Sequence, residues 1–131
     1  MNGLDYAAIC EALAALPQES RRRIVEHAAT RGYAAKDLAE LMGVSPPAVS
    51  RYLHGTLAPS TGAICRLLMS IDEDTRLELL LLAAREIWRL LGALLDQLPQ
   101  GPEVEKLLTE IADTLSEKLA AYHLGARREE Y

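Results

Sequence analysis

The chain has 131 residues, of which 50% are hydrophobic and 25% are charged, and its formal net charge is −5. This length suits one domain or two small units, and the composition is that of a folded globular protein rather than a disordered one. The longest uninterrupted apolar run, 79–84, is far shorter than the roughly 20 residues that cross a bilayer. Residues 1–19 contain no Lys or Arg, so we do not expect a secretory signal there. We therefore expect a cytoplasmic protein without a membrane partner.

Cysteine and histidine give no indication of a metal or cofactor site. The two cysteines, Cys10 and Cys65, are too few for a disulfide framework or a metal cluster, and each has apolar neighbours. We therefore expect both to be small core residues. The three histidines share no ligand spacing with carboxylates, so neither a metal nor a cofactor is predicted. Because no nucleophile–base pair and no phosphate-binding glycine loop stands out, the sequence does not predict an enzyme.

Charge is distributed unevenly along the chain. Residues 20–70 contain seven basic and three acidic side chains, a balance of +4, whereas residues 71–131 contain seven basic and thirteen acidic ones, a balance of −6. A mildly basic middle inside an acidic chain suggests that only the middle faces a polyanion.

Apolar residues recur at helical spacing throughout, so the chain is predicted to be all-α. Asp5 is the expected N-cap of the first helix, and Ser60 or Thr61 is that of the fifth. Glycines follow the second, third and fourth helices, where a left-handed residue ends a helix well. The five helices expected before residue 70 span about 5–16, 17–31, 34–42, 46–54 and 62–69.

A longer helix is expected over 72–98. Its start matches a capping box from Ser70 to Glu73, although Asp72 or Asp74 are alternative caps. The main apolar stripe consists of residues 77, 80, 81, 84, 87, 88, 91, 94, 95 and 98. More apolar residues lie outside this stripe, so the surface is wider than one core contact needs; they are Leu79, Leu82, Ala83 and Leu90.

A second long helix is expected after the break at 99–102. Its apolar residues lie along one side between Val104 and Tyr122. Residues 125–131 are expected to form a frayed tail.

The most informative stretch is 35–54, which has the pattern of two short helices joined by a tight turn. Gly43 stands where the turn needs a conformation that is costly for other residues, and Ala39 is small where the helices cross. The apolar contacts between the helices are predicted to come from Leu38, Met42, Val44, Val49 and Tyr52.

This stretch resembles the phage-repressor (Cro-like, XRE-type) helix-turn-helix family. The resemblance covers about residues 20–69 and includes the 49–53 core and the connection from Gly55 to Pro59 and Ser60. It implies a compact DNA-binding domain whose recognition helix, 46–54, enters the major groove of double-stranded DNA.

Carried over to this sequence, the resemblance implies four residues that face the bases. Arg51 is the best candidate reader, because a guanidinium pairs bidentately with guanine, although a phosphate contact or a solvated side chain is the alternative. Ser50 is a weaker candidate for a base or a phosphate. Pro47 and Ala48 are placed to touch a thymine methyl group.

Five further residues are candidates for phosphate contacts, each with a plainer alternative. Ser45 either caps the recognition helix or binds a phosphate. Lys36 and Arg31 are phosphate clamps or solvated charges, and His54 is a charged contact or an ordinary helix-end histidine. Arg22, in the run of three arginines at 21–23, faces a phosphate or pairs with Glu19 and Glu26.

The sequence departs from the family pattern at two places. Ala34 and Ala35 stand where family members often carry Thr or Ser and then Gln, so a polar cap and a phosphate contact are missing. Pro46 and Pro47 remove two amides at the start of the recognition helix. This helix is therefore expected to make few direct base contacts. Specificity is expected to depend on Arg51, on DNA shape or on another element.

The expected fold is a compact repressor-type helix-turn-helix domain with an extra N-terminal helix and a long C-terminal helical hairpin. The predicted divisions are 1–19, 20–69 and 70–131. One short recognition helix rarely suffices, so we expect a homodimer through residues 72–122, with Trp88 as an anchor. The alternative is that both C-terminal helices only cap the core of a monomer.

The predicted function is sequence-specific DNA binding by a homodimeric transcriptional regulator. Phosphate contacts from the basic middle segment would supply much of the affinity, with strong salt dependence. The alternative function is a helix-turn-helix used as a protein–protein interaction module, such as an adaptor or an antitoxin. Weak, salt-insensitive DNA binding and co-purification of a second protein would favour that alternative.

Overall fold

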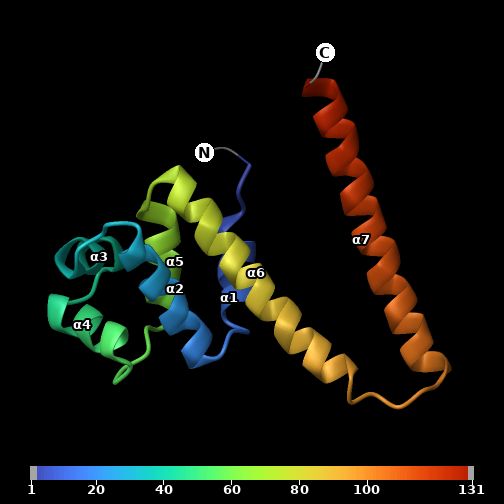
Figure 1. Ribbon diagram of the computed structural model, residues 1–131, viewed down its shortest axis with the longest axis horizontal. Helices are drawn as coiled ribbons and strands as arrows, with labels where there is room; N and C mark the ends of the chain where they lie inside the picture. Colours follow the sequence, from blue (N-terminus) through green and yellow to red (C-terminus); the bar gives the residue numbers. More distant parts are fainter. Residues whose placement is uncertain (1–2, 130–131) are drawn as a thin grey trace. The chain divides into compact units, whose positions relative to one another are not determined.

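A computed structural model describes residues 3–129 of the chain, and the side chains of residues 3–125. The described part folds into α-helices, as the sequence predicts (Figure 1). Its helices are α1 (Tyr6–Leu13), α2 (Gln18–Thr30), α3 (Ala35–Met42), α4 (Pro46–His54), α5 (Thr61–Ser70), α6 (Glu73–Leu95) and α7 (Pro102–Glu129). Over the described range, no helix is long and apolar enough to span a membrane.

Contacts within the chain define two compact units, which are described separately. The first unit covers 1–92, with α1 to α5 and most of α6, and the second covers 93–131. The core of the first unit is built from α1 to α6, and many of its side chains have no more than 2% of their surface exposed; they include Leu13, Ile24, Val25, Leu38, Met42, Val49, Ile64, Leu67 and Leu68.

Side-chain caps set the starts of α1 and α5. Asp5 accepts a hydrogen bond from the Ala8 amide at 3.1 Å, as predicted. Ser60 accepts one from the Ala63 amide at 3.1 Å, which decides between the two caps expected for α5. Both caps satisfy backbone N–H groups that have no partner inside the helix.

The predictions for the start of α6 and the end of α7 need correction. The predicted capping box at 70–73 is wrong, because Ser70 is the last residue of α5. Asp72 caps α6 instead and accepts a hydrogen bond from the Thr75 amide at 2.9 Å. The predicted frayed tail is wrong for 125–129, since α7 continues to Glu129; one glycine costs a helix only about 1 kcal/mol. Residues 130–131 lie outside the described part.

The face of α6 that joins the core overlaps only part of the main stripe expected from the sequence, through Leu80 and Ile87. Leu79 and Ala83, which lie outside that stripe, have only 0% and 5% of their surface exposed. Leu77, Leu81 and Trp88, which lie within it, remain 56%, 46% and 58% exposed. Because α6 has two apolar faces, helical spacing alone could not identify the one that packs inward.

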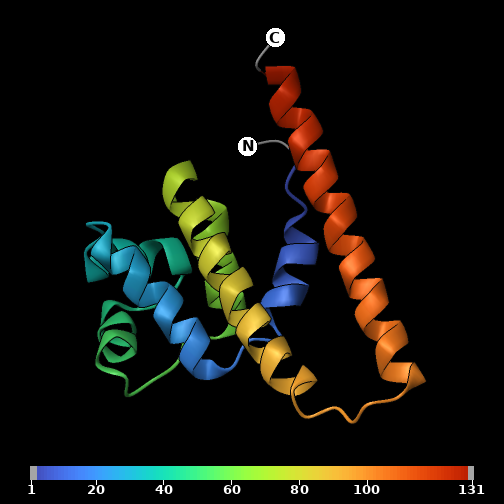
Figure 2. The ribbon, with the colours of Figure 1, turned by 45° about the vertical axis from the view of Figure 1, so that its right-hand side comes forward.

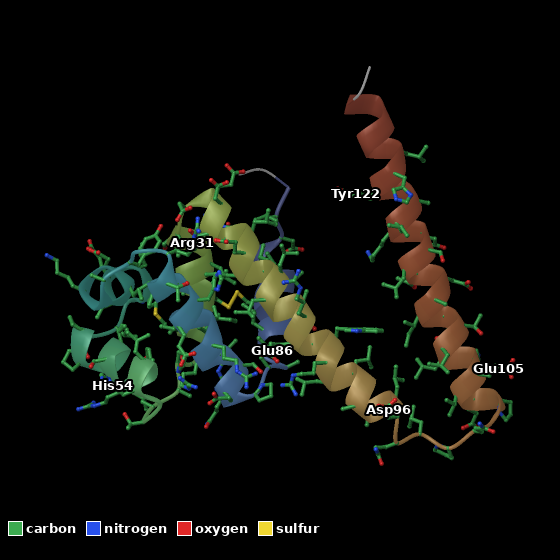
Figure 3. All side chains as sticks on the ribbon, viewed as in Figure 1. Arg31, His54, Glu86, Asp96, Glu105 and Tyr122 are labelled. Carbon is green, nitrogen blue, oxygen red and sulfur yellow. A yellow bond between two sulfur atoms is a disulfide. The ribbon has the colours of Figure 1, made fainter. Side chains whose placement is uncertain are left out.

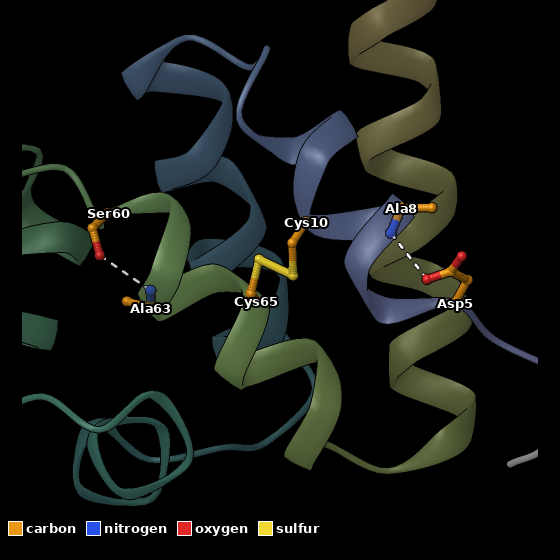
Figure 4. Close-up of a disulfide and its surroundings, with 6 residues drawn as sticks. All are labelled: Asp5, Ala8, Cys10, Ser60, Ala63 and Cys65. Carbon is orange, nitrogen blue, oxygen red and sulfur yellow. Dashed lines mark hydrogen bonds between the residues drawn. A yellow bond between two sulfur atoms is a disulfide. The ribbon is translucent and has the colours of Figure 1, made fainter.

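A disulfide joins Cys10 of α1 to Cys65 of α5, with the two Cα atoms 5.6 Å apart (Figure 4). Cys65 is buried, and Cys10 packs against the core. The expectation of small core residues thus holds for their location, but the covalent link was not expected. This bond ties the N-terminal helix to the rest of the first unit.

Candidate nucleic-acid interface

Two short helices, α3 and α4, form a helix-turn-helix at one edge of the first unit; Figures 1 and 2 show them side by side. Gly43 ends α3 in a left-handed conformation with φ of 69°, which glycine adopts without steric cost. The Val44 amide then donates to the Ala39 carbonyl at 3.0 Å and closes the turn. This turn fixes the direction in which α4 leaves α3.

The helix α4 has one buried and one exposed side. Val49 and Tyr52 have 0% and 5% of their surface exposed and anchor α4 in the core. Pro46, Pro47 and Arg51 are exposed on the other side. An exposed edge carried by a firmly packed helix is the arrangement that a groove-binding helix needs.

Arg51 lies on this exposed edge. Its guanidinium has no hydrogen-bond or ion-pair partner within the described residues. Its carbonyl accepts a hydrogen bond from the Thr56 amide at 3.0 Å, which fixes the backbone at the end of α4. Five N–H donors are therefore free to meet a ligand.

Ser50 and His54 form a local pair one turn apart on the same helix. The His54 ring donates from Nδ1 to the Ser50 carbonyl at 2.6 Å, and the Ser50 hydroxyl lies 3.4 Å from the same nitrogen. Figure 3 shows His54 at the end of α4. Because Nδ1 is engaged, Nε2 is the ring nitrogen left for an outside partner.

The start of α4 offers no free amide to an anion. Pro46 and Pro47 have no N–H, and the Ala48 amide donates to the Ser45 side chain at 3.3 Å. Of the two roles expected for Ser45, the structure thus provides the capping one. The usual anion site of a helix N-terminus is therefore closed here.

The start of α3 is more open than that of α4. Ala34 is its N-cap residue and cannot accept a hydrogen bond with its side chain; its own amide donates to Asp37 at 3.3 Å. Among the described residues, the amides of 35–37 have no acceptor. Lys36 lies in this turn, is exposed and has no ion-pair partner in the described part. Backbone and side-chain donors for an anion thus meet at one place.

Two of the predicted phosphate contacts are engaged with carboxylates. Arg31 forms an ion pair with Glu78 of α6, with Nε 2.9 Å from a carboxylate oxygen, and Figure 3 shows Arg31 at the end of α2. Arg22 pairs with Glu19 and Glu26 on its own helix. For Arg22, the structure thus shows the carboxylate pairing that the sequence offered as the alternative to a phosphate contact. For Arg31, it shows a partner that the sequence did not indicate.

The other two arginines of the run 21–23 also have internal partners. Arg21 donates to the carbonyls of Pro59 at 2.8 Å and Leu16 at 2.7 Å. Arg23 donates to the buried carboxylate of Glu86 at 2.6 Å, and this hydrogen bond lowers the pKa of Glu86. The run therefore holds the first unit together rather than forming a free basic patch.

Sequence reasoning missed one cation beside the turn. Arg66 of α5 is exposed, and its guanidinium lies over Gly43, where a Cβ atom on that glycine would collide with Nη1. The two residues are 23 positions apart, so no local spacing could have indicated this contact.

The geometry defines a repressor-type helix-turn-helix domain. Residues 29–73 match the family described as Helix-turn-helix. This part of the chain belongs to the phage-repressor-like (Cro-like, XRE-type) helix-turn-helix family, a family of DNA-binding regulators. The resemblance inferred from residues 20–69 is thereby confirmed. No curated protein and no solved structure is similar enough to the chain to count as a match.

Proposed function

We propose that this protein is a transcriptional regulator that binds double-stranded DNA sequence-specifically as a homodimer, with α4 in the major groove. The observation that carries the proposal is the two-sided character of α4. Val49 and Tyr52 hold the helix in the core, while the Arg51 guanidinium remains exposed and has no hydrogen-bond or ion-pair partner among the described residues. Arg51 is the proposed guanine reader.

The neighbours of Arg51 would contribute less to direct readout. Pro47 and Ala48 would touch thymine methyl groups, and Ser50 would reach a base or a phosphate. His54 would approach a phosphate with Nε2, because Nδ1 is engaged with the Ser50 carbonyl at 2.6 Å. The exposed amides at the start of α3, together with Lys36, would hold a phosphate and fix the register.

The homodimer is proposed because one short helix covers only a few base pairs. Two copies would read two half-sites about one duplex turn, roughly 34 Å, apart. The leucine-rich residues 72–122 are the proposed contact between copies. Arg22, Arg31 and Ser45 would support the domain through their internal partners rather than bind DNA.

Selection of bound sequences from random duplexes at near-physiological salt is the first test, and a two-fold symmetric site is the expected result. With that site in hand, Arg51→Ala should lower the affinity ratio between selected and random DNA by roughly 10-fold or more. Lys36→Ala should instead weaken binding to both DNAs alike.

Arg51→Lys serves as the matched control, because it keeps the charge and loses the bidentate geometry. Its affinity for random DNA should stay near that of the native protein, while its preference for the selected site falls. Equal losses on both DNAs for Arg51→Ala would remove Arg51 from the reader role. Failure to select any sequence would overturn the proposed function.

A further inference from the structure

The exposed edge of α4 combines one cation with one apolar ring. Arg51 and Pro47 are both exposed and stand four positions apart in the helix. They therefore lie about 40° apart around its axis and about 6 Å apart along it. Helical side chains lean towards the N-terminus of their helix, so we expect the Arg51 side chain to extend towards Pro47. We call these two residues the Arg–Pro pair of α4.

The first turn of α4, residues 46–48, presents apolar surface and no free backbone donor. Pro46 and Pro47 have no N–H. The Ala48 amide donates to the Ser45 side chain at 3.3 Å, and the Ala48 side chain packs against the core. The start of this helix therefore offers a groove carbon atoms rather than hydrogen-bond donors.

The other polar side chains of this edge lie away from Pro47. The His54 ring donates from Nδ1 to the Ser50 carbonyl at 2.6 Å, towards the C-terminal end of α4. Pro46, which is also exposed, lies about 140° around the helix from Arg51. Pro47 is therefore the exposed side chain nearest to Arg51 on its N-terminal side.

The chemistry of this pair fits two neighbouring bases of the major groove. Guanine offers a guanidinium two acceptors, N7 and O6. The next base on the same strand is stacked about 3.4 Å away, so it meets whatever adjoins the guanidinium. A proline ring donates no hydrogen bond there, but it covers apolar surface. The apolar group that bases present in the major groove is the C5 methyl group of a pyrimidine.

We propose that the Arg–Pro pair recognises a two-base step, in which guanine stands next to a pyrimidine with a C5 methyl group on the same strand. Arg51 binds the guanine, while Pro47 and the methylene groups of Arg51 cover the methyl group. This inference rests on the proposed function and names the base step that α4 recognises.

Two bases carry this methyl group, thymine and 5-methylcytosine. They differ in one exocyclic group of the major groove, which is the O4 acceptor of thymine and the N4 amino donor of cytosine. Pro47 has no polar side-chain atom that distinguishes an acceptor from a donor. The pair therefore accepts both bases and disfavours uracil and cytosine, which lack the methyl group. Methylation of a cytosine beside the guanine thus raises the affinity of the site.

Four duplexes that differ at one base test this recognition. Each carries the site selected from random DNA, with thymine, uracil, 5-methylcytosine or cytosine beside the Arg51 guanine in one half-site. Fluorescence anisotropy should give an affinity about 3- to 5-fold higher for thymine than for uracil, and for 5-methylcytosine than for cytosine. Each comparison removes a single methyl group and leaves the hydrogen-bonding groups unchanged. Equal affinities within both comparisons would overturn the proposal.

A guanine analogue locates the base that Arg51 contacts. The 7-deaza analogue lacks the N7 acceptor, so at the contacted position it should weaken binding by the native protein and leave Arg51→Ala almost unaffected. If no guanine behaves in this way, or if the contacted guanine has purines on both sides, the inference fails. The proposed DNA-binding function survives either result, because a selected site exists. Failure to select any sequence would overturn both.

Pro47→Ala tests the proline itself. The variant should lower both methyl preferences to less than about 2-fold, because most of the apolar cover is lost. Pro46→Ala is the matched control, since it restores one N–H in the same turn but lies about 140° around the helix from Arg51. Its methyl preferences should equal those of the native protein, and circular dichroism checks that both variants fold. Methyl preferences that persist in Pro47→Ala would contradict the assigned contact.

Discussion

Gly43 combines two constraints at one residue. Its φ of 69° lies in the left-handed region, and a Cβ atom there would collide with the Arg66 guanidinium. The sequence predicts the first constraint, because the turn between two short helices needs such a residue. It could not predict the second, because Arg66 belongs to another helix.

Gly43→Ala should therefore lower the free energy of unfolding by about 1 to 2 kcal/mol for the backbone conformation alone, with an added cost for the displaced arginine. Urea unfolding followed by circular dichroism measures the change. Adding Arg66→Ala should recover only the second part of the loss. If the double variant is as stable as Arg66→Ala alone, the backbone argument is wrong.

Ion pairs are the residue-level feature that the sequence predicted least well. Arg22 lies within one helical turn of Glu19 and Glu26, so that pairing was foreseen as an alternative. The pairs from Arg23 to Glu86 and from Arg31 to Glu78 cross between helices. Such pairs depend on how the helices pack, which local spacing does not fix.

Most helices of the chain could be placed from the sequence, because their ends carry local signals. The helix α4 has the predicted range 46–54, and Asp5 caps α1 as expected. The start of α6 was harder, since several acceptors stand close together between Ser70 and Asp74. Among these acceptors, Asp72 is the residue that caps α6. It also accepts a hydrogen bond from Tyr33, which holds its carboxylate in place.

The cap at Asp72 predicts a pH dependence for the stability of α6. Hydrogen bonds from Tyr33 and from the Thr75 amide lower the pKa of Asp72 from 3.8 to about 2. A carboxyl whose pKa is lowered by folding stabilises the native state above its unfolded pKa, and this contribution is lost as the pH falls from about 4 towards 2. At neutral pH it is fully present.

Asp72→Ala should therefore be less stable than the native protein at pH 6, and the difference should shrink towards pH 2. Urea midpoints of both proteins between pH 2 and pH 6 measure this, and Glu73→Ala is a control at the neighbouring position. A difference that stays constant over this range would contradict the role of the ionised cap.

At the scale of the whole molecule, the disulfide closes a loop between positions 55 residues apart. Such a bond stabilises a protein mainly by limiting the unfolded chain, typically by about 2 to 4 kcal/mol. Because α1 lies outside the matched helix-turn-helix stretch 29–73, the bond fastens an additional helix to that domain.

Cys10→Ser should lower the free energy of unfolding by about 2 to 4 kcal/mol when measured without a reductant. A dithiol reductant should bring the native protein close to the variant. Unfolding curves with and without dithiothreitol provide the comparison. If the reductant leaves the native protein unchanged, and a thiol assay finds two free cysteines, the bond does not form in solution.

The internal partners of the arginines alter how this molecule would hold a polyanion. A count of basic residues suggests a mildly cationic middle, yet Arg22, Arg23 and Arg31 already have acidic neighbours. Lys36, Arg51 and Arg66 are the exposed cations without carboxylate partners among the described side chains of 20–70. Few counterions would then leave the duplex on binding, so ionic strength would govern its affinity less than the residue count implies. Discrimination between sequences would depend on shape and hydrogen bonding.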